Sequence, residues 1–227
     1  MMKPNFEAAR YAEIKSHLEE VRREIPSNCT LIVVTKTFPV SDLEILYDLG
    51  ERNFGENRIS EGDEKSQRIA DDVIWHFQGQ IQSNKIRSLV SWVDVIHSLD
   101  DLSHAKKIEA LATESSRRIK GFIQINLDSD PNGRGGIAPD SVEEFLKELT
   151  SITAPDRSLE IIGVMGIAPL NEDPAPAFAR LQEISHQVRA LIPGATSISA
   201  GMSGDFKVAL RYGATHLRIG SSILGTR

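Results

Sequence analysis

Residues 31–40 read LIVVTKTFPV, a buried-strand pattern followed closely by a cation. Four consecutive apolar residues, Leu31 to Val34, are typical of a strand that is covered on both faces, as the strands of parallel sheets are. Lys36 comes two residues after this run, so its ammonium group lies at the carboxyl end of the strand. The stretch therefore predicts a parallel sheet that carries a lysine at its carboxyl edge.

Strand and helix patterns alternate along the rest of the chain. Apolar residues at spacings of three and four predict helices over residues 11–25, 41–50, 141–149 and 178–191. Ser41 with Glu44, and Ser141 with Glu144, have capping-box spacing, and Gly50 suits a helix C-terminal cap. Short apolar runs predict seven more strands, at residues Asn53–Phe54, Ile74–Phe77, Val93–Ile96, Phe122–Ile125, Ile161–Val164, Thr196–Ile198 and His216–Ile219.

Eight strands alternating with helices in 227 residues favour the α/β class and a closed (β/α)8 TIM barrel with an extra N-terminal helix. An open doubly wound sheet is the alternative, but its first turn is usually rich in glycine, and TKTFP at residues 35–39 has none. No Pro/Gly/Ser-rich linker divides the chain. The prolines of NEDPAPAF, residues 171–178, are interpreted as a loop that leads into a helix. We expect one domain over residues 1–227.

Composition narrows the functional classes. The net charge is −6 with no concentrated basic block, which disfavours nucleic acid as a partner. No apolar run approaches the roughly 20 residues of a membrane span, and the N-terminus lacks a signal-peptide pattern. The single cysteine, Cys29, excludes an intrachain disulfide and is interpreted as a small buried hydrophobe. We expect a cytoplasmic protein.

The loops after the last two strands contain small polar residues that suit an anion. Barrel enzymes work at the carboxyl ends of their strands, and the loops after strands seven and eight often hold a phosphate. GMSG offers the Ser203 hydroxyl, and GSS offers the backbone N–H groups of Gly220 and Ser221, with SSILG as a short helix. Ordinary turns and N-caps would account for the same residues.

Lys36 has two interpretations as well: a surface lysine, or a Schiff-base lysine whose amine attacks a carbonyl. A strand-end lysine together with a phosphate loop favours pyridoxal 5′-phosphate (PLP), because its aldehyde condenses with a lysine and its phosphate needs an anchor. Arg218 ends the last strand and stays charged, so it would keep a facing pyridine nitrogen unprotonated.

Five stretches in this order and spacing resemble the PLP homeostasis protein family over nearly the whole chain. They are VVTKTFP (33–39), FGENRISE (54–61), WHFQGQIQSNK (75–85), SAGMSGDF (199–206) and LRIGSSILG (217–225). The resemblance implies a single-domain, fold-type III PLP barrel that is similar to the N-terminal barrel of alanine racemase. It also implies that the C-terminal β domain of that enzyme is absent.

The resemblance implies a role for each matching residue. Lys36 would form the Schiff base with PLP, and Arg218 would face the pyridine nitrogen. Asn57 and Met165 would lie against the ring. The phosphate would be held by Ser203, Gly220 and Ser221, with Gly201 and Met202 nearby. The sequence departs from the family at Arg58, where a tyrosine is usual, at Gln80, and at Arg134 in NGRGGI.

The sequence leaves two kinds of function open, a PLP carrier and an enzyme. The resemblance favours PLP buffering or delivery without a dedicated reaction, with PLP-dependent apoenzymes as potential recipients and a monomer as the expected state. The alternative is an amino-acid racemase of the alanine racemase type, which needs a second proton-transfer group. The chain's tyrosines, Tyr11, Tyr47 and Tyr212, fall on predicted helices and not at strand ends. A third class is a Schiff-base aldolase barrel without PLP.

Two further groups are given structural interpretations. His76, His97 and His216 fall in or beside predicted strands and are interpreted as core histidines, so no metal is expected. The charged stretch EGDEK, residues 61–65, is interpreted as a solvated helix or loop.

Overall fold

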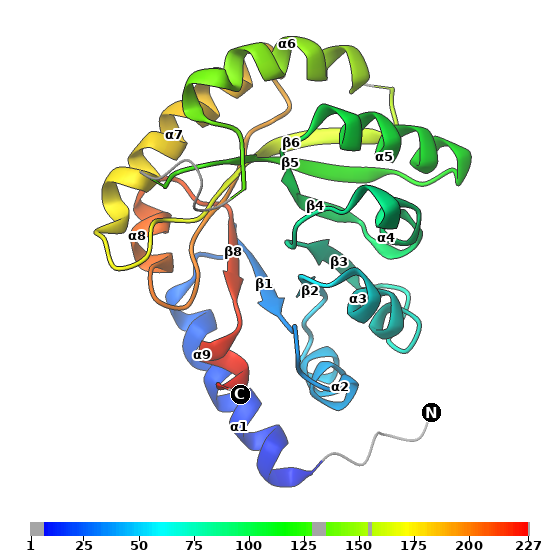
Figure 1. Ribbon diagram of the computed structural model, residues 1–227. Helices are drawn as coiled ribbons and strands as arrows, with labels where there is room; N and C mark the ends of the chain where they lie inside the picture. Colours follow the sequence, from blue (N-terminus) through cyan, green and yellow to red (C-terminus); the bar gives the residue numbers. More distant parts are fainter. Residues whose placement is uncertain (1–6, 129–134, 154–155, 227) are drawn as a thin grey trace.

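The computed structural model describes residues 7–128, 135–153 and 156–226. Eight parallel strands close into a barrel in sequential order, and β1 pairs with β8 through residues 30–33 and 216–219 (Figure 1). The predicted barrel is confirmed. The strands are β1 Thr30–Val34, β2 Asn53–Glu56, β3 Ile74–Phe77, β4 Val95–Leu99, β5 Ile119–Ile125, β6 Leu159–Gly166, β7 Ser197–Ser199 and β8 His216–Ile219.

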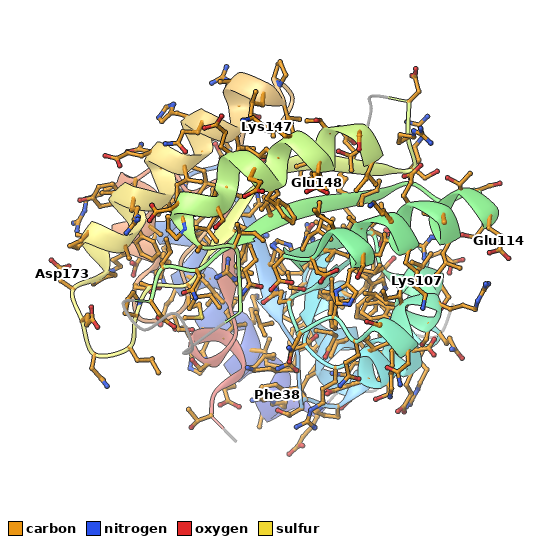
Figure 2. The ribbon with its side chains drawn as sticks, turned by 45° about the horizontal axis from the view of Figure 1, so that its top comes forward. Phe38, Lys107, Glu114, Lys147, Glu148 and Asp173 are labelled. Atoms are coloured by element: carbon orange, nitrogen blue, oxygen red, sulfur yellow. The ribbon has the colours of Figure 1, made fainter. Side chains whose placement is uncertain are left out.

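Helices surround the barrel, and the predicted N-terminal helix packs beside the last one (Figure 1). The helices are α1 Ala8–Glu24, α2 Val40–Asp48, α3 Ile59–Ser66, α4 Ile86–Trp92, α5 Leu102–Glu114, α6 Val142–Ile152, α7 Pro174–Leu191, α8 Phe206–Arg211 and α9 Ser221–Leu224, with 3-10 turns at Ser83–Lys85 and Pro139–Ser141. Charged side chains such as Lys107, Glu114 and Lys147 lie on the exposed side of these helices (Figure 2). Among the described helices, none has both the length and the apolar character of a membrane span.

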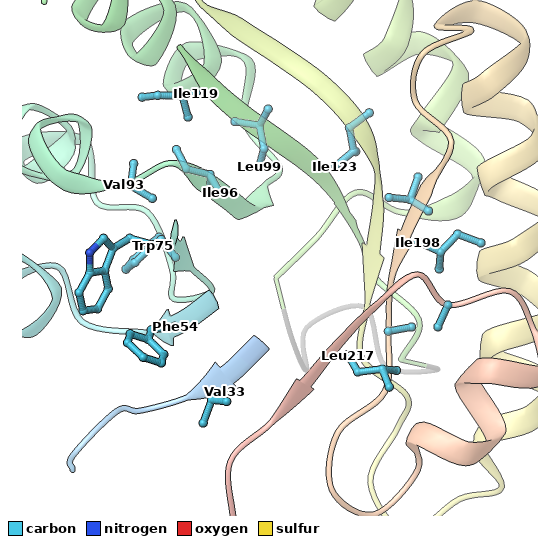
Figure 3. Close-up of a cluster of buried hydrophobic side chains, with 14 of the residues drawn as sticks. Val33, Phe54, Trp75, Val93, Ile96, Leu99, Ile119, Ile123, Ile198 and Leu217 are labelled. Carbon is cyan, nitrogen blue, oxygen red and sulfur yellow. The ribbon is translucent and has the colours of Figure 1, made fainter. Parts of the chain in front are cut away.

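Two different layers fill the molecule. Strand residues that point outward pack against the helices in one apolar layer, in which Phe54 and Trp75 make an edge-to-face contact (Figure 3). Residues alternate across a strand, so His76, between Trp75 and Phe77, points into the barrel. The barrel interior combines a small apolar cluster around Phe122 with buried polar side chains. This polar interior lies directly beneath the carboxyl end of the barrel.

Several local predictions are wrong at helix starts. Neither predicted capping box forms: Pro39 is the N-cap of α2, so Ser41 already lies within the helix, and Ser141 makes no side-chain cap bond. Ser141 has helical backbone angles because a 3-10 turn precedes α6, whereas an N-cap needs an extended backbone. The prolines of residues 171–178 do not form a loop. Pro174 starts α7, where a proline's missing N–H costs nothing, and Asp173 caps it.

Strand boundaries differ where polar residues interrupt the apolar pattern. The fourth strand begins at Val95 and not at Val93, because Val93 ends α4 by donating its N–H to the carbonyl of Leu89. Strand β4 then continues through His97 to Leu99, although sequence reasoning ended it earlier. Gly50 follows α2 with φ 97°, so the predicted glycine at the end of this helix is confirmed.

Candidate functional site

The predicted site residues all lie in, or directly after, the carboxyl-terminal half of a strand. Because the barrel is parallel and closed, these positions meet at one end of it. Strands β1, β2 and β8 are neighbours, and β7 lies between β6 and β8. The residues brought to this end are Lys36, Asn57, Met165, Gly201, Met202, Ser203, Arg218, Gly220 and Ser221.

Lys36 occupies an exposed turn two residues beyond β1. Its side chain makes no hydrogen bond or salt bridge with any residue that the structure describes. Thr37, the next residue, has φ 69°, a left-handed conformation that is unusual for a β-branched residue. The amine is therefore available, while the turn that carries it has an uncommon backbone shape.

Asn57 follows β2 and is also exposed. A Cβ atom at Gly79, in the loop after β3, would come within 2.0 Å of the Asn57 carbonyl oxygen. Only glycine permits this approach, so the loops after β2 and β3 are in direct contact at the carboxyl end of the barrel. The departures Arg58 and Gln80 are exposed beside them, and Arg134 lies outside the described residues.

Two serines meet across the ends of β7 and β8. The Ser221 hydroxyl donates to the Ser203 hydroxyl over 3.1 Å, and the backbone N–H of Ser222 donates to Ser203 over 3.3 Å. Gly201 has φ 92°, and a Cβ there would lie 2.8 Å from the Cα of Phe206. The predicted short helix, α9, starts directly after Gly220. These contacts bring hydroxyl and N–H groups of both loops together, which suits the phosphate of PLP.

Arg218 lies at the base of these loops and is 3% exposed. Its guanidinium donates to the Ser199 hydroxyl over 2.7 Å and to the Gly166 carbonyl over 3.0 Å. Burial lowers its pKa to about 10, partly offset by the charge of Asp205, so it stays charged at neutral pH. No described carboxylate forms a salt bridge with Arg218, which leaves its positive charge available to a ligand.

A buried hydrogen-bond chain continues from Arg218 through the barrel interior. The Ser199 hydroxyl lies 2.9 Å from Nδ1 of His97, and Nε2 of His97 lies 2.9 Å from Nδ1 of His76. Nε2 of His76 lies 3.0 Å from Oδ1 of Asn53. With both imidazoles neutral and the Asn53 carbonyl oxygen as acceptor, every bond in the chain points from Arg218 toward Asn53.

In this direction each neutral histidine carries its proton on Nε2. Burial is the main cause that lowers the pKa of His76 to about 3 and that of His97 well below 6.5. His97 also stacks on Phe122, with ring centroids 4.5 Å apart. The core interpretation of these two histidines is confirmed, and His97 is linked to Arg218 through the Ser199 hydroxyl.

Met165 lies in the same interior and not at the open mouth. It is 1% exposed, packs with Val95 and Phe122, and is paired in register with Ser199. Tyr11 and Tyr47 donate their hydroxyls to Asp48 and Asp72 on the outer surface, over 2.7 and 2.8 Å. Tyr212 ends α8, so all three tyrosines lie on helices, as the sequence predicts.

Sequence reasoning missed an ion-pair cluster behind Lys36. Lys65, interpreted as part of a solvated stretch, is buried, and its ammonium group lies 2.7 Å from both Glu56 and Glu61. The interpretation of residues 61–65 as solvated is therefore wrong for Lys65. A signal was present: Ile59, Gly62 and Lys65 recur at a spacing of three, and they form the buried face of α3.

Comparisons with known proteins identify the family of this chain. Residues 10–227 match the family model described as alanine racemase, N-terminal domain. A pyridoxal phosphate homeostasis protein of Mycobacterium tuberculosis (strain ATCC 25618 / H37Rv) is 34% identical over 240 residues, covering 97% of this chain and 91% of that protein.

Solved structures extend the comparison to the fold. PipY of Synechococcus elongatus PCC7942, without PLP, has a TM-score of 0.86 at 32% identity, covering 93% of this chain and 100% of PipY. The same protein with PLP bound has a TM-score of 0.84. Alanine racemase of Corynebacterium glutamicum shares the fold, with a TM-score of 0.75 at 15% identity, covering 94% of this chain and 60% of the racemase. The chain therefore belongs to the pyridoxal phosphate homeostasis protein family, within the wider family of alanine racemase N-terminal domains.

Proposed function

We propose that this protein binds PLP covalently through Lys36 and serves PLP homeostasis, by buffering or delivering the cofactor, without a dedicated reaction of its own. PLP supplies an aldehyde that condenses with an amine. One observation carries the proposal: an unpaired, exposed lysine lies at the same barrel end as two facing serine loops and a buried arginine. Relatives named for PLP homeostasis, and PipY with PLP bound, support it.

Each part of PLP has a counterpart among these residues. Ser203, Gly220 and Ser221 would hold the phosphate, aided by the Gly201–Met202 backbone. Asn57 would line the ring, with Met165 beneath it. Arg218 would face the pyridine nitrogen and, as a cation, disfavour a proton there.

The same contacts argue against efficient amino-acid chemistry. An unprotonated pyridine nitrogen withdraws fewer electrons from a bound amino acid than a protonated one. A racemase also needs an acid/base group on each face of the substrate, and a missing general acid or base costs about 10²–10⁴-fold in rate. The hydroxyls of Tyr11 and Tyr47 are bonded to outer-surface carboxylates. We therefore propose the carrier role over the racemase role.

Further parts of the proposal concern the setting of the protein. We propose that residues 1–227 form one domain, which the family match over residues 10–227 supports. We also propose a monomer in the cytoplasm, where reducing conditions suit the single buried thiol of Cys29. PLP-dependent apoenzymes would be its recipients.

Borohydride trapping tests the proposal. Purified protein mixed with PLP should turn yellow, and reduction followed by peptide mass spectrometry should place a pyridoxyl group on Lys36. Lys36→Ala should abolish the colour and the label, while Lys85→Ala, an exposed lysine in the loop after β3, should leave both unchanged. A protein that stays colourless with PLP overturns the proposal. Robust turnover of alanine enantiomers would favour the racemase instead.

A further inference from the structure

We infer that Lys65 is a positioning residue for Lys36: its buried ammonium group fixes the backbone on both sides of the reactive lysine and is itself out of reach of an aldehyde. The inference rests on the proposed role of Lys36. It assigns a function to a residue that lies outside the cofactor site, on α3, and that no sequence motif for PLP binding includes.

The ammonium group of Lys65 is fully enclosed. The residue is 4% exposed, and Nζ lies 2.7 Å from each of three oxygens: the Thr35 carbonyl, Oε1 of Glu56 and Oε1 of Glu61. An ammonium group has three N–H donors, so every donor is used. Burying a charge without such partners would cost a large free energy, so we expect the ammonium group to keep all three contacts.

The cluster reaches the residues before and after Lys36. On one side, the Thr35 carbonyl oxygen accepts a hydrogen bond from Lys65, and the Thr35 hydroxyl donates to Oε1 of Glu56 over 2.6 Å. On the other side, the Thr37 backbone N–H donates to Oε1 of Glu61 over 2.6 Å. Lys65 therefore stands between the two carboxylates that hold the neighbours of Lys36.

The backbone of Thr37 shows why such support is needed. A β-branched residue at φ 69° is in a strained conformation that persists only where its surroundings enforce it. Two contacts enforce it: the Phe38 N–H donates to the Thr35 carbonyl over 3.1 Å and closes a turn, and the Thr37 N–H donates to Glu61, which Lys65 orients one helical turn away. Without the ammonium group, the turn can relax and move the Lys36 amine.

The arrangement also separates the two lysines by accessibility. Lys36 is exposed and unpaired, whereas the nitrogen of Lys65 is surrounded by oxygens. Of these two lysines, an aldehyde that enters the barrel mouth can therefore reach only Lys36. The cluster thus leaves the Lys36 amine accessible and keeps the Lys65 ammonium group inaccessible.

Two measurements on three variants test the inference. Lys65→Met removes the ammonium group, and Glu61→Leu removes the acceptor for Thr37 together with one of the three acceptors of Lys65, while leaving the Lys65–Glu56 pair. Arg22→Met is the matched control, because it removes the partner of another buried carboxylate, Glu51, which precedes β2 at the opposite end of the barrel. The first measurement is amide hydrogen exchange at Thr37 by NMR without PLP, and the second is the rate of PLP capture at Lys36.

Lys65→Met and Glu61→Leu should each speed Thr37 exchange at least about 10-fold relative to Arg22→Met. Both should slow capture at Lys36 by about 10- to 100-fold, the effect of a small misplacement of a reacting group. Thr37 exchange in Lys65→Met that matches the control overturns the inference. If Lys65→Met does not fold, an unchanged rate of capture at Lys36 in Glu61→Leu overturns it, because the bond from Thr37 to Glu61 is the route through which Lys65 acts. Because exchange is measured without PLP, a wild-type protein that fails to bind PLP refutes the proposed function separately.

Discussion

Replacing Lys65 by methionine should destabilise the protein strongly at neutral pH and much less in acid. The substitution keeps an unbranched side chain, one atom shorter, but removes all three hydrogen bonds of the ammonium group. Glu56, which is 0% exposed, would retain only the Thr35 hydroxyl on Oε1, and its Oε2 has no partner even in the wild type. Removing one member of a buried ion pair costs about 3–5 kcal/mol, because the other charge remains buried.

The pH dependence follows from the carboxyl group that is left behind. Burial already raises the pKa of Glu56 above 4.5, and the charge of Lys65 opposes that rise. In Lys65→Met the folded-state pKa rises further, so the folded state binds more protons than the unfolded state above pH 4.5. Stability therefore falls as pH increases from 4.5, by at most about 1.4 kcal/mol per pH unit.

Urea unfolding of wild type and variant between pH 4.5 and 8 measures this difference. The loss of stability should be largest near pH 8 and shrink toward pH 4.5, because a growing fraction of the buried Glu56 is protonated as pH falls. Adding Glu56→Gln to Lys65→Met should remove most of the pH dependence. A loss that is the same at every pH would refute the account of Glu56 as a buried, uncompensated charge.

Three other substitutions probe the interior chain and the loops. His97→Phe should lower the free energy of unfolding in urea by about 1–3 kcal/mol, because it leaves two buried partners unsatisfied. Since the pKa of His97 is well below 6.5, the wild type should lose stability as pH falls below 6.5, and the variant should lose less. Equal pH slopes in the two proteins would contradict the assignment of His97 as neutral. Gly79→Ala should lower the free energy of unfolding by at least about 2 kcal/mol, because its Cβ would lie 2.0 Å from the Asn57 carbonyl oxygen. Gly194→Ala is the control, because nothing lies within 4 Å of a Cβ there. Similar losses of stability in the two variants would refute the close approach. Ser203→Ala should weaken PLP binding about 10- to 100-fold in a fluorescence titration, the value of one hydrogen bond to a charged group, and unchanged affinity would remove this serine from the phosphate site.

The fold was predictable because its signals are local. Apolar runs mark strands, three- and four-residue spacings mark helices, and eight alternating units leave few topologies. Lys36 and the serine loops could be identified because the strand-end rule places them at one end of any parallel barrel. The residues needed only to be near strand ends, so errors of two or three residues in the boundaries did no harm.

The buried polar contacts were not predictable, because each depends on partners from distant elements. Lys65 appears as one charge in an acidic stretch, and only the approach of Thr35 and Glu56 from β1 and β2 explains its burial. The chain from Arg218 to His76 similarly joins four strands, and no spacing in the sequence reports it. The capping boxes were wrong for a related reason: Pro39 takes the N-cap position of α2, and the 3-10 turn before α6 gives Ser141 helical backbone angles, so its side chain makes no cap bond.

The measurement that tests the central claim most directly is the mass of the borohydride-reduced protein after incubation with PLP. The account predicts one pyridoxyl group per chain, located on Lys36 and lost in Lys36→Ala. A label on Lys65 or another lysine, or no label at all, would contradict it.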